Sequence, residues 1–274
     1  MSGLNRLTID ELYAFMRALD RSGVTPDVIR SVAADETLAV SMVLGYEQER
    51  VRRAEELRFH RMLFTPPVYQ LKTVRMWNVE RNWGFTDEQF RAAASVIPSV
   101  PDRYLVGAVL IPHLGTVQRT HDELWAMAAS RHPQSDLWDR FEPDSQEIDG
   151  ETRHFGVELA SGQEHAPGLR WEVIDFGSHV GKAVTDMAGR PLPHAGILAA
   201  AALHPEWVAY MDGNRVPFVW LSGYVVTGDS SDAFGNVPTL SLEPYAGKPM
   251  LRRMHDDGRK GKPTYAVPTF HRTI

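Results

Sequence analysis

The stretch DFGSHVGKAV, residues 175–184, contains the residue types that phosphate-binding loops use. A loop of this kind has four residues between its first glycine and Gly-Lys, followed by a Ser or Thr whose hydroxyl binds magnesium. Here three residues separate Gly177 from Gly181, and Ala183 stands where the hydroxyl is needed. The spacing therefore favours a buried strand that ends in a glycine turn over a nucleotide site.

The chain contains eleven histidines and no cysteine, which excludes disulfides, thiolate metal sites and cysteine nucleophiles. Neither His-Glu-x-x-His nor Gly-x-Ser-x-Gly occurs in the sequence. We therefore predict no catalytic residue, no metal site and no cofactor. The alternative is a hydrolase or transferase whose site follows no motif and forms only on folding, with the candidates His113, His121, Asp122, His179 and Lys182.

Basic residues are concentrated near the carboxy terminus. Residues 248–272 hold seven Lys and Arg against two acids, a net charge of +5, in a chain whose formal charge is −6. Because loops and hairpins on a rigid scaffold often carry binding residues, we expect a basic hairpin here that contacts an anionic ligand or a protein partner. The predicted ligand-binding residues are Tyr245, Arg252, Arg253, His255, Arg259 and Lys260.

Helical patterns fill the first 62 residues. Apolar residues recur at helical spacing from about 9 to 21, a second helix begins at Pro26, and a third is predicted over 36–62. Residues 1–62 hold nine Lys and Arg against ten Asp and Glu, so a nucleic-acid partner is not expected. A homo-oligomer held by these helices, in a structural or assembly protein, is a further alternative. The two prolines in FTPPVY end this module.

The remaining chain alternates between strand-like and helical patterns. VYQLKTVRMW is half alternating and predicts a strand, and YLVGAVLIP predicts a buried strand. Thr86 with Gln89, and Thr120 with Glu123, form capping-box patterns that predict helices after them. Beyond residue 140, a helix at about 194–211 interrupts the predicted strands LRWEVIDFG, VPFVWLSGYVV, VPTLSLEP and TYAVPTF.

These patterns predict an α+β protein, with a helical module over residues 1–66 and a mixed α+β domain over 67–274. A further boundary is predicted near 98–103. The sheet is expected to be irregular and mainly antiparallel, because prolines and glycines interrupt its strands. The sequence shows neither a signal peptide nor a membrane span, so we expect a soluble, cytoplasmic protein without a membrane partner.

The segments VLIPHLGTVQRTHDELWAMAASRHP, GLRWEVIDFG and PHAGILAAAALHPEW resemble a group of uncharacterised bacterial proteins over about residues 100–274. Their order, followed by WLSGY and YAVPTF, is also similar to bacterial C-type-lectin-like domains. That resemblance implies a ligand surface on irregular loops at about 245–262. It does not imply calcium-dependent sugar binding, because Glu243-Pro244-Tyr245 replaces Glu-Pro-Asn. A binding or recognition protein is the function expected from the sequence.

Overall fold

A computed structural model describes residues 27, 31, 34–101, 103–131, 146–148, 151–153, 155–160, 165–187, 190–228, 238–242, 249–253 and 263–271. The contacts divide the chain into two compact units, Met1–Glu56 and Leu57–Ile274. The predicted helix at 9–21 lies outside the described residues. Within the described part, no helix is both long and apolar enough to cross a membrane.

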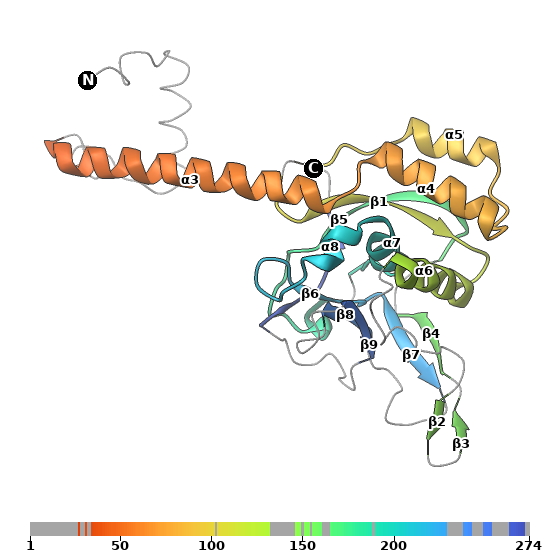
Figure 1. Cartoon of the computed structure of the whole chain (residues 1–274). Coiled ribbons are helices and arrows are strands. Elements are labelled where there is room, and N and C mark those ends of the chain that lie inside the picture. Colours follow the sequence, from red (N-terminus) through yellow and green to blue (C-terminus); the bar gives the residue numbers. More distant parts are fainter. Residues whose placement is uncertain are drawn as a thin grey trace. The chain divides into compact units, whose positions relative to one another are not determined.

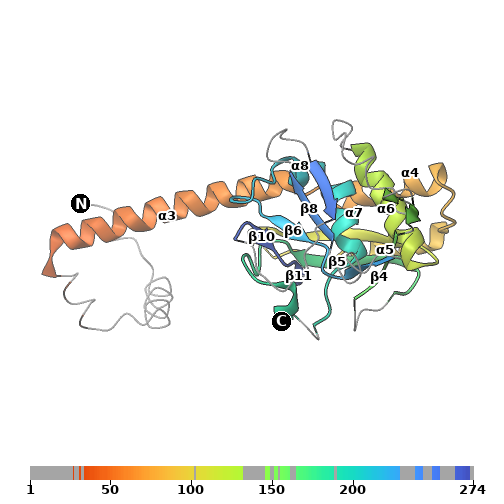
Figure 2. The same cartoon turned by 90° about the horizontal axis from the view of Figure 1, so that it is seen from below.

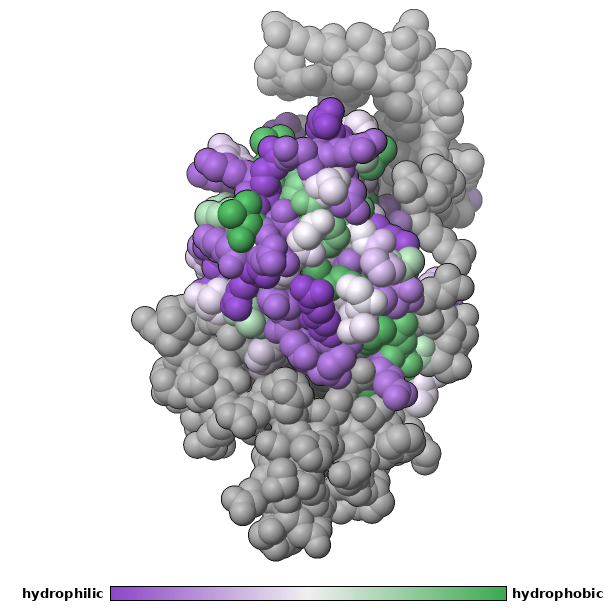
Figure 3. Space-filling model, turned by 90° about the vertical axis from the view of Figure 1, so that its right-hand side faces the viewer, coloured by the Kyte–Doolittle hydropathy of each residue, from purple (hydrophilic) through white to green (hydrophobic). Residues whose placement is uncertain are grey.

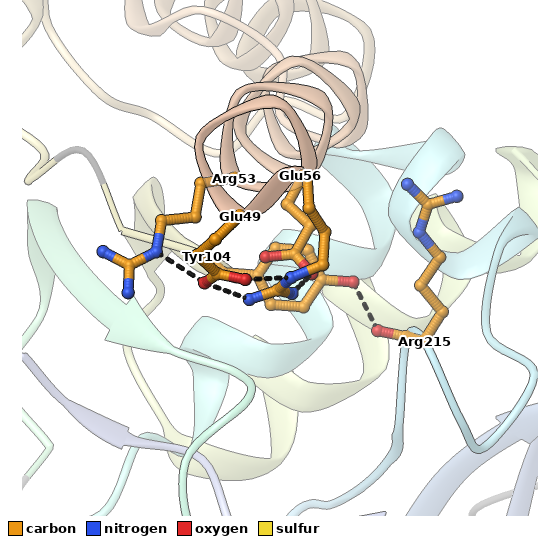
Figure 4. Close-up of polar contacts among 6 residues, drawn as sticks. Glu49, Arg53, Glu56, Tyr104 and Arg215 are labelled. Carbon is orange, nitrogen blue, oxygen red and sulfur yellow. Dashed lines mark hydrogen bonds and ion pairs between the residues drawn. The ribbon is translucent and has the colours of Figure 1, made fainter. Parts of the chain in front are cut away.

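Helix α3, Glu36–Leu63, confirms the helix predicted over 36–62. Ion pairs at helical spacing run along its surface: Glu49 accepts hydrogen bonds from Arg52 and from Arg53, and Arg52 also pairs with Glu56 (Figure 4). The two arginines lower the pKa of the Glu49 carboxyl to about 2. This part of the helix is stabilised by local pairs on a solvated face, as its charge pattern predicts.

Two helices follow, α4 over Pro67–Glu80 and α5 over Asp87–Ser95. The strand predicted from VYQLKTVRMW is therefore wrong. Proline occupies the first turn of α4, where its missing N–H costs nothing, and the buried residues Gln70, Val74 and Trp77 follow the helical period. The pattern misled because one buried position is a glutamine. In α5 the predicted capping box between Thr86 and Gln89 is present.

A three-stranded sheet in the order β1-β5-β11 forms the centre of the second unit. Strand β1, Val106–His113, is buried along its whole length and pairs antiparallel with β5, Gly168–Asp175. Strand β11, Thr269–Phe270, pairs with the other edge of β5. The predicted strands YLVGAVLIP and LRWEVIDFG are confirmed, and they bring residues 113 and 168 together at one end of the sheet.

Helices cover both faces of this sheet. On one face α4 packs against β1 and α5 against β5; on the other, α7, Ala195–Leu203, packs against β1 (Figure 1). Every residue of α7 is buried, as expected for a helix that is apolar all round. Helix α6, Val117–Arg131, packs beside α7. The predicted capping box of Thr120 and Glu123 is wrong, because the helix already begins at Val117 and the Thr116 hydroxyl accepts the capping bond from the Arg119 N–H.

A second sheet has the strand order β10-β6-β8-β9, of which Figure 2 labels β10, β6 and β8. Only the β10–β6 pair is parallel among the strand pairs of the described residues, so the mainly antiparallel prediction holds. The strand bounds are β6 Phe218–Trp220, β8 Pro238–Leu242, β9 Pro249–Arg253 and β10 Tyr265–Ala266.

Two further pairs are β2, Gln146–Ile148, with β3, Glu151–Arg153, and β4, Phe155–Leu159, with β7, Tyr224–Gly228. Three elements predicted as continuous are divided. VPFVWLSGYVV forms β6 and β7, and TYAVPTF forms β10 and β11 in different sheets. The helix predicted over 194–211 becomes α7 and α8, Pro205–Ala209, because Pro205 cannot continue the first helix.

The segment after β5 is a turn, as the short spacing of its glycines predicts. The Asp175 carboxylate accepts hydrogen bonds from the N–H groups of Gly177 and Ser178, which closes the chain reversal. Gly181 has a φ of +78°, and a 3-10 helix, η3, follows at Val184–Met187. The stretch thus has the strand and turn of the prediction.

The surface of the second unit is mixed in character. The face drawn in Figure 3 is mainly hydrophilic, with separate hydrophobic patches between the polar side chains. Exposed apolar side chains on α4 and just after α5 are Val68, Tyr69, Met76, Val79 and Val96. On another part of this unit the Tyr104 hydroxyl donates to the Arg215 carbonyl at 2.5 Å (Figure 4).

Candidate metal centre

Three histidines from separate segments meet at one end of the central sheet. His113 is the last residue of β1, His165 precedes β5, and His194 immediately precedes α7. One ring nitrogen from each lies within 4.8 Å of the others. The ring centroid of His113 lies 5.4 Å from that of His165 and 5.4 Å from that of His194. We call these three residues the histidine cluster.

The strand register and one glycine position the histidine cluster. His113 pairs with Gly168, so the chain that enters β5, including His165, lies beside the end of β1. His194 is held by a tight turn before β7. A Cβ on Gly223 would lie 2.6 Å from the His194 Cβ and 2.8 Å from the Pro193 carbonyl oxygen. Only glycine allows that turn to approach so closely.

Hydrogen bonding leaves the cluster with free nitrogen lone pairs. The Nε2 of His165 lies 2.7 Å from the Leu114 carbonyl oxygen. Because a carbonyl only accepts, Nε2 carries the proton and Nδ1 holds a lone pair. That Nδ1 and both ring nitrogens of His113 and of His194 are buried without a hydrogen-bond partner among the described residues. Each such atom costs about 1–3 kcal/mol unless something else binds it.

Burial keeps two of these rings neutral. It lowers the pKa of His113 to about 3, with further lowering by His194, His165 and Arg170. Burial likewise lowers the pKa of His194 to about 4, assisted by His165 and Arg170. Neutral imidazole is the form that binds metal ions, so no proton has to be removed from these two rings near neutral pH.

The spacing of the nitrogens suits a tetrahedral metal ion after a small movement. Zinc–nitrogen bonds of about 2.0–2.1 Å place tetrahedral ligand atoms roughly 3.3 Å apart. The three ring nitrogens lie at most 4.8 Å from one another. If all three separations had this value, each nitrogen would have to move about 0.9 Å toward the centre of the triangle to reach the tetrahedral spacing. Side-chain rotations can supply that movement. Three histidines leave a fourth position for water or another ligand, as in catalytic zinc sites.

A second polar group lies next to the cluster. Tyr224 is fully buried and its hydroxyl lacks a partner within the described part of the chain. Its ring centroid lies 5.7 Å from that of His194 and 5.4 Å from that of His121. The Nδ1 of His121 lies 2.9 Å from the Asp122 carboxylate. Burial, with the charges of Glu172 and Asp122, raises the pKa of Tyr224 well above its usual range.

Glu172 lies in the middle of β5, on the sheet face that α7 covers. Its Oε2 is sealed from solvent without a partner among the described residues, and a Cβ on Gly196 would lie 2.5 Å from it. Burial raises the pKa of Glu172 to about 8, although the charge of Arg170 acts in the opposite direction. The Glu172 carboxyl group is not among the candidate metal ligands, which are the three histidines of the cluster.

The candidates of the hydrolase or transferase alternative separate into two regions. His113 belongs to the cluster, and His121 and Asp122 lie near it on α6. His179 and Lys182 lie in the turn after Asp175, which pairs with Val106 at the opposite end of the β1–β5 ladder. Seven residue steps of about 3.3 Å separate the two ends, so these two side chains do not join the cluster.

The predicted ligand-binding residues lie largely outside the described residues. Arg252 and Arg253 lie in β9, where they pair with Thr239 and Pro238 of β8. The rest of the set, Tyr245, His255, Arg259 and Lys260, is not described. The ligand-binding assignment of all six stays a prediction.

Sequence reasoning missed His165, His194, Glu172 and Tyr224 because they are far apart in the chain and follow no motif. Two weak signals were present. Glu172 is one of two acids, with Asp175, within the otherwise apolar stretch WEVIDF, and His194 stands directly before the apolar helix AGILAAAAL. Neither signal identifies a metal site without the register that joins the segments.

Comparisons of the chain with family models, with curated proteins and with solved structures give no match.

Proposed function

We propose that this protein binds a divalent transition-metal ion, with zinc as the representative case, through His113, His165 and His194. The observation that carries the proposal is the approach of three ring nitrogens to within 4.8 Å, with lone pairs that no other described group uses. The alternative, a structural cluster of three buried imidazoles, leaves several polar atoms without partners at a cost in stability. A bound ion would use one nitrogen of each ring and so remove part of that cost.

One hydrogen bond behind the cluster, made by His165, supports the same assignment. Metal-bound histidines usually donate their other ring N–H to a carbonyl or carboxylate, which fixes the tautomer and orientation of the ring. His165 already makes such a bond to the Leu114 carbonyl. Since β1 ends at His113, this carbonyl belongs to the residue after another ligand. Movement of one ligand is therefore coupled to the orientation of the next.

The experiment is a calorimetric titration of chelator-treated protein with Zn²⁺. We expect one ion per chain, and we expect His194→Ala to weaken binding by at least about 100-fold, because loss of a residue that only hydrogen-bonds to a metal ligand already costs about 10- to 100-fold. His179→Asn is the matched control, since His179 has a φ of +57° that asparagine tolerates and lies at the other end of β5. Equal zinc binding by His194→Ala, His179→Asn and the wild type would refute the proposal.

A second candidate is recognition of a protein or anionic partner through the basic carboxy-terminal stretch. The charge distribution favours it, since residues 248–272 carry a net charge of +5 in an acidic chain. The C-type-lectin-like resemblance, with its ligand surface at about 245–262, is part of this proposal. Its test is the triple variant Arg252→Ala, Arg253→Ala and Arg259→Ala, which should lose affinity for an immobilised polyanion such as heparin.

A further inference from the structure

The histidine cluster lies beside a fixed positive charge on the same face of the sheet. We propose that the fourth position on the metal ion takes a small anionic ligand, a carboxylate, and that Arg170 assists its binding. This inference rests on the proposed metal site and names the chemical class of what that site binds.

The strand register places Arg170 next to the cluster. His113 pairs with Gly168 and Ile111 pairs with Arg170, and residues two apart on a strand face the same side. Arg170 is therefore the diagonal neighbour of His113, a separation of about 7–8 Å that long side chains can bridge. Glu172, two residues further along β5, lies on the face covered by α7, since its Oε2 lies against Gly196. Arg170 shares that face, but its side chain is exposed.

The charge balance of the site favours an anion. Three neutral imidazoles do not offset the two positive charges of a divalent ion, and Arg170 adds a third. Arg170 acts at the cluster because it is the diagonal cross-strand neighbour of His113 on the same face of the sheet. Among the described residues, the group that could hold the ion consists of the three histidines and includes no acidic residue. An external anion can therefore supply the missing negative charge.

Access and chemistry are consistent with a small ligand. His165 is only half-buried, unlike His113 and His194, so the cluster approaches the surface on the side from which β5 enters. A carboxylate oxygen is a good ligand for zinc, and a guanidinium binds the second carboxylate oxygen through charge-assisted hydrogen bonds. The carboxylate would thus bridge the metal ion and Arg170.

The experiment uses the full chain loaded with Co²⁺, whose visible absorption bands change when the fourth ligand changes. Acetate is titrated against the neutral analogue acetamide at constant ionic strength. We expect acetate, and not acetamide, to shift the bands in a saturable manner. Arg170→Gln should raise the acetate Kd about 10-fold, the loss of one charge-assisted hydrogen bond. The control Arg91→Gln removes an exposed arginine from α5, on the opposite face of the sheet, and should leave the Kd unchanged.

The possible outcomes separate this inference from the metal site itself. Cobalt bands that acetate does not alter would overturn the inference and leave metal binding intact. Equal effects of acetate and acetamide would overturn the charge selectivity, and an unchanged Kd in Arg170→Gln would overturn the role of Arg170. Absence of cobalt binding would overturn both proposals. Cobalt bands of equal intensity in Arg170→Gln and the wild type would show that the substitution leaves the metal site intact.

Discussion

Replacement of Glu172 by glutamine should make the protein progressively more stable than the wild type as the pH rises from about 5 to about 8. The sealed carboxyl group has a pKa of about 8 in the folded chain, against 4.5 for the unperturbed group, because burial disfavours its charge. A raised pKa contributes stability that is fully present below about pH 4.5 and is lost as the pH rises through about 8. Glutamine has nearly the same shape and cannot ionise, so it removes this loss.

The magnitude follows from proton linkage. Between pH 5 and pH 8, a carboxyl with these two pKa values reduces the free energy of unfolding by about 3 kcal/mol. The charge of Arg170 acts in the opposite direction and is already part of the balance. The wild type should therefore lose about 3 kcal/mol relative to Glu172→Gln across this pH range.

The assay is urea unfolding of metal-free wild type and Glu172→Gln at several pH values between 5 and 8, followed by tryptophan fluorescence. Glu88→Gln, an exposed change on α5, provides the background for any Glu-to-Gln substitution. If the difference between wild type and Glu172→Gln does not vary with pH beyond that background, the burial of an ionisable Glu172 carboxyl is refuted.

Further substitutions test the supporting structure. Gly196→Ala should cost about 1–3 kcal/mol in urea unfolding, because its Cβ would lie 2.5 Å from the Glu172 Oε2. Gln70→Leu should cost about 2–4 kcal/mol in the same assay, since buried Gln70 binds two backbone carbonyls and one backbone N–H; a loss below 0.5 kcal/mol would contradict the bridge. Thr86→Ala should lower thermal stability by about 1 kcal/mol through loss of the capping box. Metal-free protein should lose stability as the pH falls below 6.5, because burial lowers the pKa of His204 to about 3, and His204→Gln should reduce that slope.

Several elements in and around the central sheet could be predicted from the sequence because they carry strong local signals. The continuous apolar run of β1 and the capping box of α5 each depend on neighbouring residues, and both predictions are confirmed. Helix α4 was mistaken for a strand because Gln70 is buried through hydrogen bonds to β1, a tertiary effect that hydrophobic periodicity cannot register.

The histidine cluster could not be predicted, because its geometry depends on long-range pairing. His113 and His165 are brought together by the β1–β5 register, and His194 joins them through the packing of α7 on β1. Single histidines without a motif carry little information until those contacts are known. Oligomerisation through the amino-terminal helices stays a prediction.

The most direct test of the metal centre is X-ray absorption spectroscopy of the zinc-loaded protein. The structure predicts a first shell with three imidazole nitrogens at about 2.0–2.1 Å and one further oxygen ligand. In His113→Ala the imidazole scattering should fall from three rings to two or disappear. A zinc spectrum with fewer than three imidazoles in the wild type, or one unchanged in His113→Ala, would contradict the assignment of His113, His165 and His194 as the ligands.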